Sequence, residues 1–492
     1  MNQNLVKLMI VLVAGTGAFS CSRQQKETVH TSQKPNIILI VSDDMGWKEL
    51  GCYGNPVHET PNIDRFAQEA VRFTDAYAAA PVCTPTRASI QTGKYPARLH
   101  MTVWSENARG IHGITRGQKL IPAASEPDLP LDEFTIAEAL KSEGYNTAHI
   151  GKWHLGESEY YPENQGFDIN IGGGAWGCPA TYFYPYRGPF GGSVRYIPDL
   201  ERSGTEEDMY FKDREGEFLT DRLTDEAIRI MEDGVADGAP FFLNLNYYNV
   251  HTPIEAPDSL VDYYKDKMAK SGSDRNPVFA AMVHIVDHNV GRVLTAINDL
   301  GIADNTVVIF TSDNGGYIGI HRGMQVTDNS PLRSGKGTLY EGGIRIPLII
   351  KYPGVSQKGS VCDIPVITND FYPTFCEIAD IDIDVPDGLS LLPLLKNSDA
   401  GLERDILFWH YPHYYSFTTP VSAVRYKDWK LLKYYEDNSV ELYNLAEDLG
   451  ENKDLSEERA DIKGMMLSKL EEWFEETEAN LPSQNPEYSP VF

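Results

Sequence analysis

The sequence has few cysteines and no excess of positive charge. Its 492 residues include six cysteines with no CxxC pair and no metal-like spacing, which excludes a zinc-finger protein. The formal net charge is −28 at pH 7, so the chain lacks the basic face of a general nucleic-acid binder. An acidic excess of this kind is typical of a soluble surface. The chain also lacks any Asn-x-Ser/Thr sequence, which disfavours a glycosylated secreted protein.

The chain begins with an apolar stretch that is too short to cross a bilayer. This stretch, at residues 8–19, follows Lys7 and predicts a secretory signal peptide over residues 1–20. Cys21 and the polar linker that continues to residue 34 resemble the lipid-modified start of bacterial lipoproteins. The alternative is an ordinary cleaved signal with a tethering linker. We expect an exported periplasmic or outer-membrane lipoprotein, with a lipid anchor as its contact to the membrane.

Apolar strands alternate with amphipathic helices over most of the chain. The runs that favour buried parallel strands lie at 36–44, 146–152, 240–251, 306–316 and 346–354. Between them lie helical patterns, so we predict an α/β fold with a mostly parallel central sheet sandwiched by helices over residues 35–400. After residue 400 the pattern changes to short antiparallel strands and a closing helix. Residues 401–492 are therefore predicted to form a smaller α+β domain.

Acidic side chains follow two of these strands. Asp43 and Asp44 end the first strand, and Asp313 and Asn314 end the strand at 306–316. Ligands bind at the carboxyl ends of strands in such sheets, so these four side chains are predicted to converge. Three carboxylates and an amide suit a hard cation, Ca²⁺ or Mg²⁺, better than Zn²⁺ or Cu²⁺. The alternative is that Asp and Asn simply begin turns.

A cysteine lies at the start of a short helical pattern. Cys83 precedes Thr84, a possible N-cap, and Pro85, while Gly93 can end the helix. The free N–H groups of a helix N-terminus favour an anion there, and Arg87 follows one turn later. The alternative is that Cys83 is only a small buried residue.

Further basic residues follow other predicted strands. They are Lys152, His154, His251 and Lys336. Each by itself is more often solvated than catalytic. Together with Arg87 they would surround the acids with cations, as expected for binding a tetrahedral anion beside a metal.

The motifs resemble the signatures of the formylglycine-dependent (type I) sulfatase family, within the alkaline phosphatase-like superfamily. "CTPTRASIQTG" is similar to the first signature, Cys-x-Pro-x-Arg followed by Thr-Gly, and "GKWHLG" to the second. "SDD", "HTP", "SDNGG" and the "GK" before "EGGIRIP" stand in the family's order, and the resemblance covers roughly residues 34–480. Thr86 departs from the Ser that many members have.

The resemblance implies a cofactor set and a role for each matched residue. Cys83 would be oxidised to Cα-formylglycine by a formylglycine-maturating enzyme, and Ca²⁺, rather than Mg²⁺, would bind residue 83 with Asp43, Asp44, Asp313 and Asn314. The hydrated aldehyde would attack sulfur with one hydroxyl and expel sulfate with the other. The remaining roles are stabilisation of the diol by Arg87, binding of sulfate oxygens by Lys152 and Lys336, and proton transfer by His154 and His251.

Aromatic and histidine side chains indicate a carbohydrate substrate. His100, Trp104, Trp176 and His413 could stack on sugar rings or contact hydroxyls, although such aromatics can also merely pack long insertions. We expect a sulfated glycan, and the resemblance favours a galactose or N-acetylgalactosamine sulfate. The alternatives are a phosphonate or phosphate monoester hydrolase of the same superfamily and a glycan-binding lipoprotein without catalysis.

Overall fold

The computed structural model describes residues 34–110, 117–186, 216–383 and 385–489. The chain from Lys34 to Phe492 is one compact unit. The predicted signal peptide, Cys21 and nearly all of the polar linker lie outside the described residues, and the domain boundary near residue 400 stays a prediction. In the described part, no helix is long and apolar enough to span a bilayer. The described cysteines are all free thiols.

An eight-stranded sheet forms the centre of the molecule. The strand order is β12-β2-β11-β8-β1-β7-β5-β6. In that order the strands are β12 (Val361–Cys362), β2 (Val71–Phe73), β11 (Leu348–Lys351), β8 (Thr306–Ser312), β1 (Asn36–Ser42), β7 (Phe241–Asn246), β5 (Asn146–Gly151) and β6 (Ile169–Ile171). β1 pairs in parallel with β7 and β8, and β5 with β7 and β6, whereas β11 runs antiparallel to β8 and β2. The prediction of a mostly parallel sheet is confirmed.

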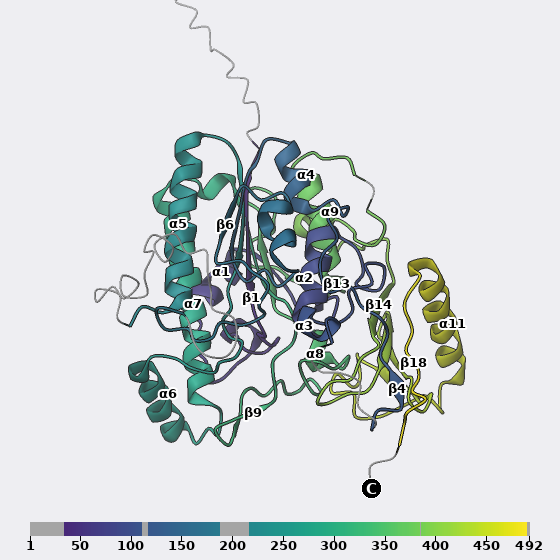
Figure 1. Cartoon of the computed structure of the whole chain (residues 1–492). Helices are drawn as coiled ribbons and strands as arrows, with labels where there is room; N and C mark the ends of the chain where they lie inside the picture. Colours follow the sequence, from purple (N-terminus) through teal and green to yellow (C-terminus); the bar gives the residue numbers. More distant parts are fainter. Residues whose placement is uncertain (1–33, 111–116, 187–215, 384, 490–492) are drawn as a thin grey trace, which may run out of the picture. The chain divides into compact units, whose positions relative to one another are not determined.

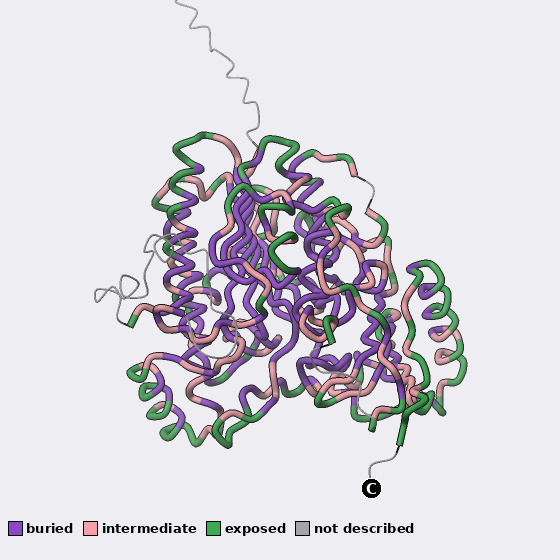
Figure 2. The backbone as a smooth tube through the Cα atoms, in the orientation of Figure 1, coloured by how far each residue is buried: buried purple, intermediate pink, exposed green. Residues whose placement is uncertain are grey.

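Helices cover both faces of this sheet, as Figure 1 shows. One face carries α1 (Pro61–Gln68), α5 (Leu219–Asp237) and α7 (Pro277–Asp299), with α6 (Asp258–Ser271) packed on α7. The other face carries α2 (Cys83–Thr92), α4 (Ile136–Ser142), α9 (Phe371–Ile378) and α10 (Leu392–Lys396). Successive side chains of β1 point to opposite faces of the sheet. Ile38 packs into the core on the side of α7, while Ile37 and Leu39 pack into the core on the side of α9. Figure 2 shows the resulting buried interior.

A second sheet follows near the C-terminus, as predicted. Its four antiparallel strands are β14 (Ile406–Tyr411), β15 (Val421–Tyr426), β16 (Trp429–Tyr434) and β17 (Val440–Asn444), and α11 (Ala460–Thr477) packs against it. The remaining short elements are β3 (Ala76–Tyr77), α3 (Ser105–Ala108), β4 (Leu120–Ile121), β9 (Ile320–His321), β10 (Met324–Gln325), α8 (Glu341–Ile344), β13 (Val366–Ile367) and β18 (Ser483–Gln484).

Buried ion pairs join the second sheet to helix α8. Lys430 of β16 lies 2.8 Å from a carboxylate oxygen of Glu341 in α8 and 2.9 Å from one of Glu451. All three side chains are shielded from solvent. Because an unpaired charge is costly in such a place, these contacts fix the sheet against α8.

Candidate active site

The acidic strand ends converge where β1 and β8 lie side by side. Ser42 pairs with Ser312, so the residues that follow leave the sheet at the same edge. The Asp44 backbone N–H donates to Asp313 Oδ1 at 3.2 Å, and Asn314 Nδ2 donates to Asp44 Oδ1 at 2.8 Å. The structure therefore brings Asp43, Asp44, Asp313 and Asn314 together, and all are buried.

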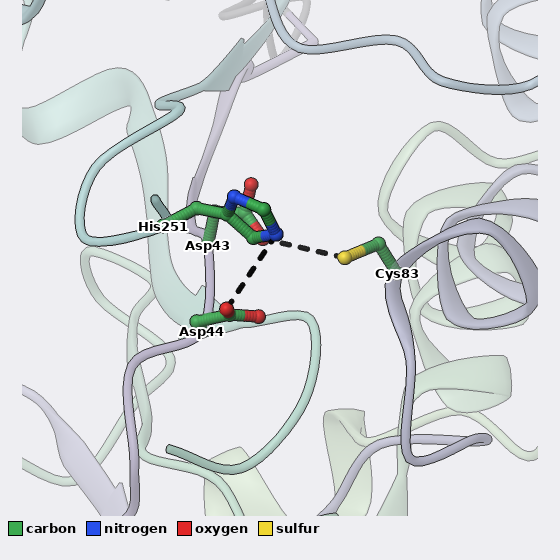
Figure 3. Close-up of side chains that lie close together, drawn as sticks. All are labelled: Asp43, Asp44, Cys83 and His251. Carbon is green, nitrogen blue, oxygen red and sulfur yellow. Dashed lines mark hydrogen bonds and ion pairs between the residues drawn. The ribbon is translucent and has the colours of Figure 1, made fainter. Parts of the chain in front are cut away.

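Cys83 faces this group from the first turn of α2. Its side chain is shielded, with the residue only 3% exposed, and Sγ lies 3.4 Å from Asp43 Oδ1 and 3.5 Å from Lys336 Nζ. Figure 3 shows Cys83 pointing toward Asp43. The helix starts at Cys83, two residues before the predicted first helical residue, Pro85, and Thr84 does not cap it: the Thr84 hydroxyl donates to the His154 carbonyl at 2.9 Å instead. Gly93 ends the helix in the left-handed region, with φ 70°.

Three buried cations pair with the three carboxylates. Lys152 Nζ lies 2.6 Å from Asp43 Oδ2, and Lys336 Nζ lies 2.6 Å from Asp44 Oδ1. The Arg87 guanidinium contacts Asp313 Oδ2 through Nε at 2.9 Å and Nη2 at 2.8 Å. Arg87 Nη1 also donates to Asn246 Oδ1 at 2.8 Å. Asn246 was not predicted, although an Asn at the end of a buried strand was a signal for a polar contact.

The two histidines reach the site from different loops. His251 follows β7, and its Nε2 lies 3.6 Å from Asp44 Oδ2, as the dashed line in Figure 3 marks. Ligand atoms of Asp43, Asp44, Cys83 and His251 lie within 4.8 Å of one another. His154 follows β5, and its Nε2 lies 2.7 Å from Oε2 of Glu106 in α3. No signal in the sequence singled out Glu106.

Burial and neighbouring charges shift the pKa values of these groups. Burial, with the Asp313 carboxylate, raises the pKa of Asp43 to about 7. Burial is the largest influence on Asp44 and Asp313 and opposes their ionisation. The neighbouring cations together outweigh it, with Lys336 first at Asp44 and Arg87 first at Asp313, so both pKa values are lowered. Burial and Asp313 raise the pKa of the Cys83 thiol far above neutral pH. A thiolate at Cys83 is therefore disfavoured, and the unmodified residue is a poor nucleophile.

The side chains at the strand ends fit a hard divalent cation. They offer carboxylate and amide oxygens, the ligands that Ca²⁺ and Mg²⁺ prefer. Asn314 Oδ1 is buried and has no hydrogen-bond partner among the residues that the structure describes, so one oxygen is free to coordinate. A cation there would also offset the repulsion between Asp43 and Asp313, which contributes to the raised pKa of Asp43.

Two of the four predicted substrate residues line a cavity beside the site. Trp104 and His413 border a cavity of about 540 Å³ together with Tyr415. The rings of Trp104 and Tyr415 meet edge to face, with centroids 5.6 Å apart. Gly337, next to Lys336, lies against the Tyr415 ring, so the cavity adjoins the cation cluster.

The other two predicted substrate residues lie outside this cavity lining. Trp176 is 52% exposed, and His100 is half-buried with its carbonyl accepting from the Glu126 N–H at 2.7 Å. Tyr415 was not singled out from the sequence, although it lies two residues after the predicted His413 in an aromatic segment, residues 408–417.

Comparison with known proteins places the chain among characterised relatives. The family model described as Sulfatase matches residues 35–381, and the model described as N-sulphoglucosamine sulphohydrolase, C-terminal, matches residues 335–477. A sulfatase of Formosa agariphila is 35% identical, covering 90% of this chain and 89% of its own length. Rat N-acetylgalactosamine-6-sulfatase is 33% identical, covering 77% of this chain and 68% of its own length.

Solved structures with a similar fold were also found. Ps i-CgsB in complex with k-i-k-neocarrahexaose is 29% identical with a TM-score of 0.70, covering 90% of this chain and 93% of that chain. A second structure of Ps i-CgsB has a TM-score of 0.72 at 28% identity, covering 93% and 95%. The matched fold, the family model over most of the chain and the relatives above 30% identity lead to one conclusion. The chain belongs to the sulfatase family and is a sulfuric ester hydrolase.

Proposed function

We propose that the enzyme removes sulfate from a sulfated carbohydrate with Cys83 converted to Cα-formylglycine. The observation that carries this proposal is the position of Cys83 in the first turn of α2, between Asp43 and Lys336. A galactose or N-acetylgalactosamine sulfate is the narrower candidate. It is supported by the relative named N-acetylgalactosamine-6-sulfatase and by the similar structure that holds k-i-k-neocarrahexaose.

The modification would give residue 83 the reactivity that its thiol lacks. The hydrated aldehyde supplies a hydroxyl that attacks sulfur and a second hydroxyl that allows sulfate to leave as the aldehyde re-forms. A plain serine or cysteine would leave a covalent sulfate that needs a separate hydrolysis step. The enzyme would need a formylglycine-maturating enzyme as a partner.

Asp43, Asp44, Asp313 and Asn314, with residue 83, would hold Ca²⁺. When bound, Ca²⁺ polarises a sulfate oxygen and favours the ionised form of a hydroxyl on residue 83. Lys152 and Lys336 would bind sulfate oxygens, since both Nζ atoms lie within the same buried cluster. Arg87 would hold Asp313 in place beside residue 83 through its two contacts. His154 and His251 would transfer protons at the nucleophile and the leaving oxygen.

The cavity lined by Trp104, His413 and Tyr415 would receive the sugar. An aromatic wall beside a cation cluster suits a ring that carries an anionic group. Trp176 and His100 remain candidates for sugar contacts outside this cavity.

We also propose that the protein is exported and anchored by a lipid on Cys21. Residues 1–20 would be removed as the signal peptide, residues 21–34 would form the linker, and residues 35–400 and 401–492 would form the two domains. Mass spectrometry of the mature N-terminus is expected to find an acylated Cys21. A mature chain starting elsewhere, without a lipid, would contradict the anchor.

The proposed chemistry is tested by Cys83→Ser. The variant is expected to lose at least about a thousandfold in sulfate release while its circular dichroism stays unchanged, because serine supplies no aldehyde. Cys52→Ser, which changes a thiol away from the site, serves as control and is expected to keep activity.

Formylglycine is first verified by mass spectrometry. Defined sulfated saccharides and matching phosphate esters are then assayed in parallel. Retained activity in Cys83→Ser would refute the nucleophile, and faster phosphate release would refute the substrate class.

A further inference from the structure

A half-buried carboxylate that belongs to none of the sulfatase signatures holds His154. Glu106 lies in α3, and its Oε2 is 2.7 Å from His154 Nε2. Oε1 of the same carboxylate accepts from the Gly177 N–H at 3.3 Å. We propose that Glu106 is a positioning residue that fixes the ring orientation and the tautomer of His154. This inference rests on the proposed function only in giving His154 a role in proton transfer.

The contact determines which ring nitrogen carries the proton. An ionised carboxylate can only accept a hydrogen bond, so Nε2 must donate. Burial opposes ionisation of Glu106, but the contacts with His154 and with backbone N–H groups together outweigh it and lower the Glu106 pKa to about 2. Nδ1 is then the unprotonated nitrogen of a neutral imidazole.

The other ring nitrogen is left as a buried acceptor. His154 is only 3% exposed, and within the described residues its Nδ1 has no hydrogen-bond partner. A buried polar atom without a partner is costly in a protein interior, so it calls for an explanation. A lone pair at Nδ1, held for a hydroxyl of the nucleophile or the substrate, supplies one.

The backbone of His154 is fixed on both sides. Its N–H donates to the Gly174 carbonyl at 3.0 Å, and its carbonyl accepts from the Thr84 hydroxyl at 2.9 Å. Thr84 adjoins Cys83, so the same contact ties His154 to the helix that carries the nucleophile. With the backbone held, the Glu106 contact decides how the ring is turned about its side-chain bonds.

A purely structural ion pair would look different. It would need a doubly protonated His154, whose Nδ1–H would then point at no acceptor within the described residues. Burial, moreover, lowers the pKa of His154 even though Glu106 opposes that shift. The geometry therefore favours a neutral, oriented base over a stabilising charge pair.

The first experiment measures the tautomer in the full-length enzyme. ¹⁵N-histidine NMR, with His154→Gln used to assign the signal, is expected to show His154 protonated at Nε2 and unprotonated at Nδ1. In Glu106→Leu, which removes the acceptor, the signal is expected to shift toward a mixture of tautomers. A proton on Nδ1 in the unaltered enzyme would overturn the proposal.

The second experiment measures kinetics of the same variants on a sulfate ester. Glu106→Gln and Glu106→Leu are expected to lower kcat by about 10-fold and about 100-fold, with KM within about twofold, because positioning partners act on the reacting state. Glu157→Gln is the control, since this nearby carboxylate has a 61% exposed side chain. Unchanged kcat in a folded Glu106→Leu variant would overturn the proposal. If the unaltered enzyme cleaves no sulfate ester, the proposed function fails, whereas the NMR measurement still decides the tautomer.

Discussion

The glycine at position 177 lies against the imidazole of His154. A Cβ built there would come 2.4 Å from His154 Cε1 and 2.8 Å from Nδ1, closer than real Cβ atoms approach. Gly177→Ala should therefore displace the ring and lower kcat by about 10- to 100-fold, since a misplacement of about 1 Å has effects of that size. Steady-state kinetics with a sulfate ester measures it.

Gly174→Ala is the matched control in the same loop. A Cβ at Gly174 would meet its nearest atom, Tyr161 Oη, at 3.6 Å, which is ordinary contact. Its kcat is expected to stay within about twofold of the unaltered enzyme. Equal losses in both variants would mean that the loop, not the contact with His154, is responsible.

Site residues that stand in short sequence motifs could be predicted, whereas residues whose partner is distant in sequence could not. Asp43, Asp313 and Lys336 were predicted because each stands in a short motif with its own chemistry. Glu106 and Tyr415 were missed because their importance comes from a neighbour distant in sequence: His154 lies 48 residues from Glu106, and Gly337, whose loop abuts Tyr415, lies in another segment.

Two neighbouring strands supply the oxygens for the proposed Ca²⁺. Because β1 and β8 each end in this cluster of acids, a bound cation should stabilise the folded protein by about 2.7 kcal/mol at a hundredfold excess over its Kd. Ca²⁺ is expected to raise the Tm of the unaltered enzyme, and a chelator to lower both Tm and sulfate release. Thermal unfolding followed by circular dichroism measures the shift.

Variants at the two ends of β8 separate a specific site from general charge effects. Asp313→Asn removes a ligand at the carboxyl end and should abolish the Ca²⁺-dependent shift. Asp304→Asn changes an exposed carboxylate before the amino end and should leave the shift intact. A shift of equal size in both variants would contradict a site at the strand ends.

Elements were predictable to within a few residues. The apolar run at 36–44 became β1 (Asn36–Ser42), with the acids just outside it, because strand periodicity is local information. The predicted start of α2 was two residues too late because its expected cap, Thr84, binds the His154 carbonyl instead. A local sequence pattern cannot show that a distant carbonyl will bind the hydroxyl of the expected cap.

On the scale of the whole molecule, one buried lysine links the second sheet to α8. Lys430 contacts Glu341 and Glu451, so Lys430→Met should leave Glu451 without its lysine and Glu341 with Arg345 alone, and lower the free energy of unfolding by about 3–5 kcal/mol. Denaturant unfolding measures the change. Lys427→Ala, which removes an exposed partner of Asp405, should change it by less than about 0.5 kcal/mol. Similar changes in the free energy of unfolding for the two variants would show that the buried contacts do not hold the second sheet against α8.

Both sheets could be predicted from the sequence, but the ion pairs that hold the second sheet against α8 could not. Strand periodicity and turn residues are local, and they indicated an antiparallel sheet after residue 400. The charges that connect it to α8 come from three separate segments, and as sequence they look like ordinary surface residues.

The burial of Cys83 also has a consequence for when its side chain could be modified. Helix α2 is buried throughout, and the thiol is closed in by Asp43 and Lys336. An enzyme that oxidises this side chain needs access to it, and the folded protein gives none. The proposed conversion of Cys83 would therefore have to precede folding, and a molecule that folded first would stay inactive.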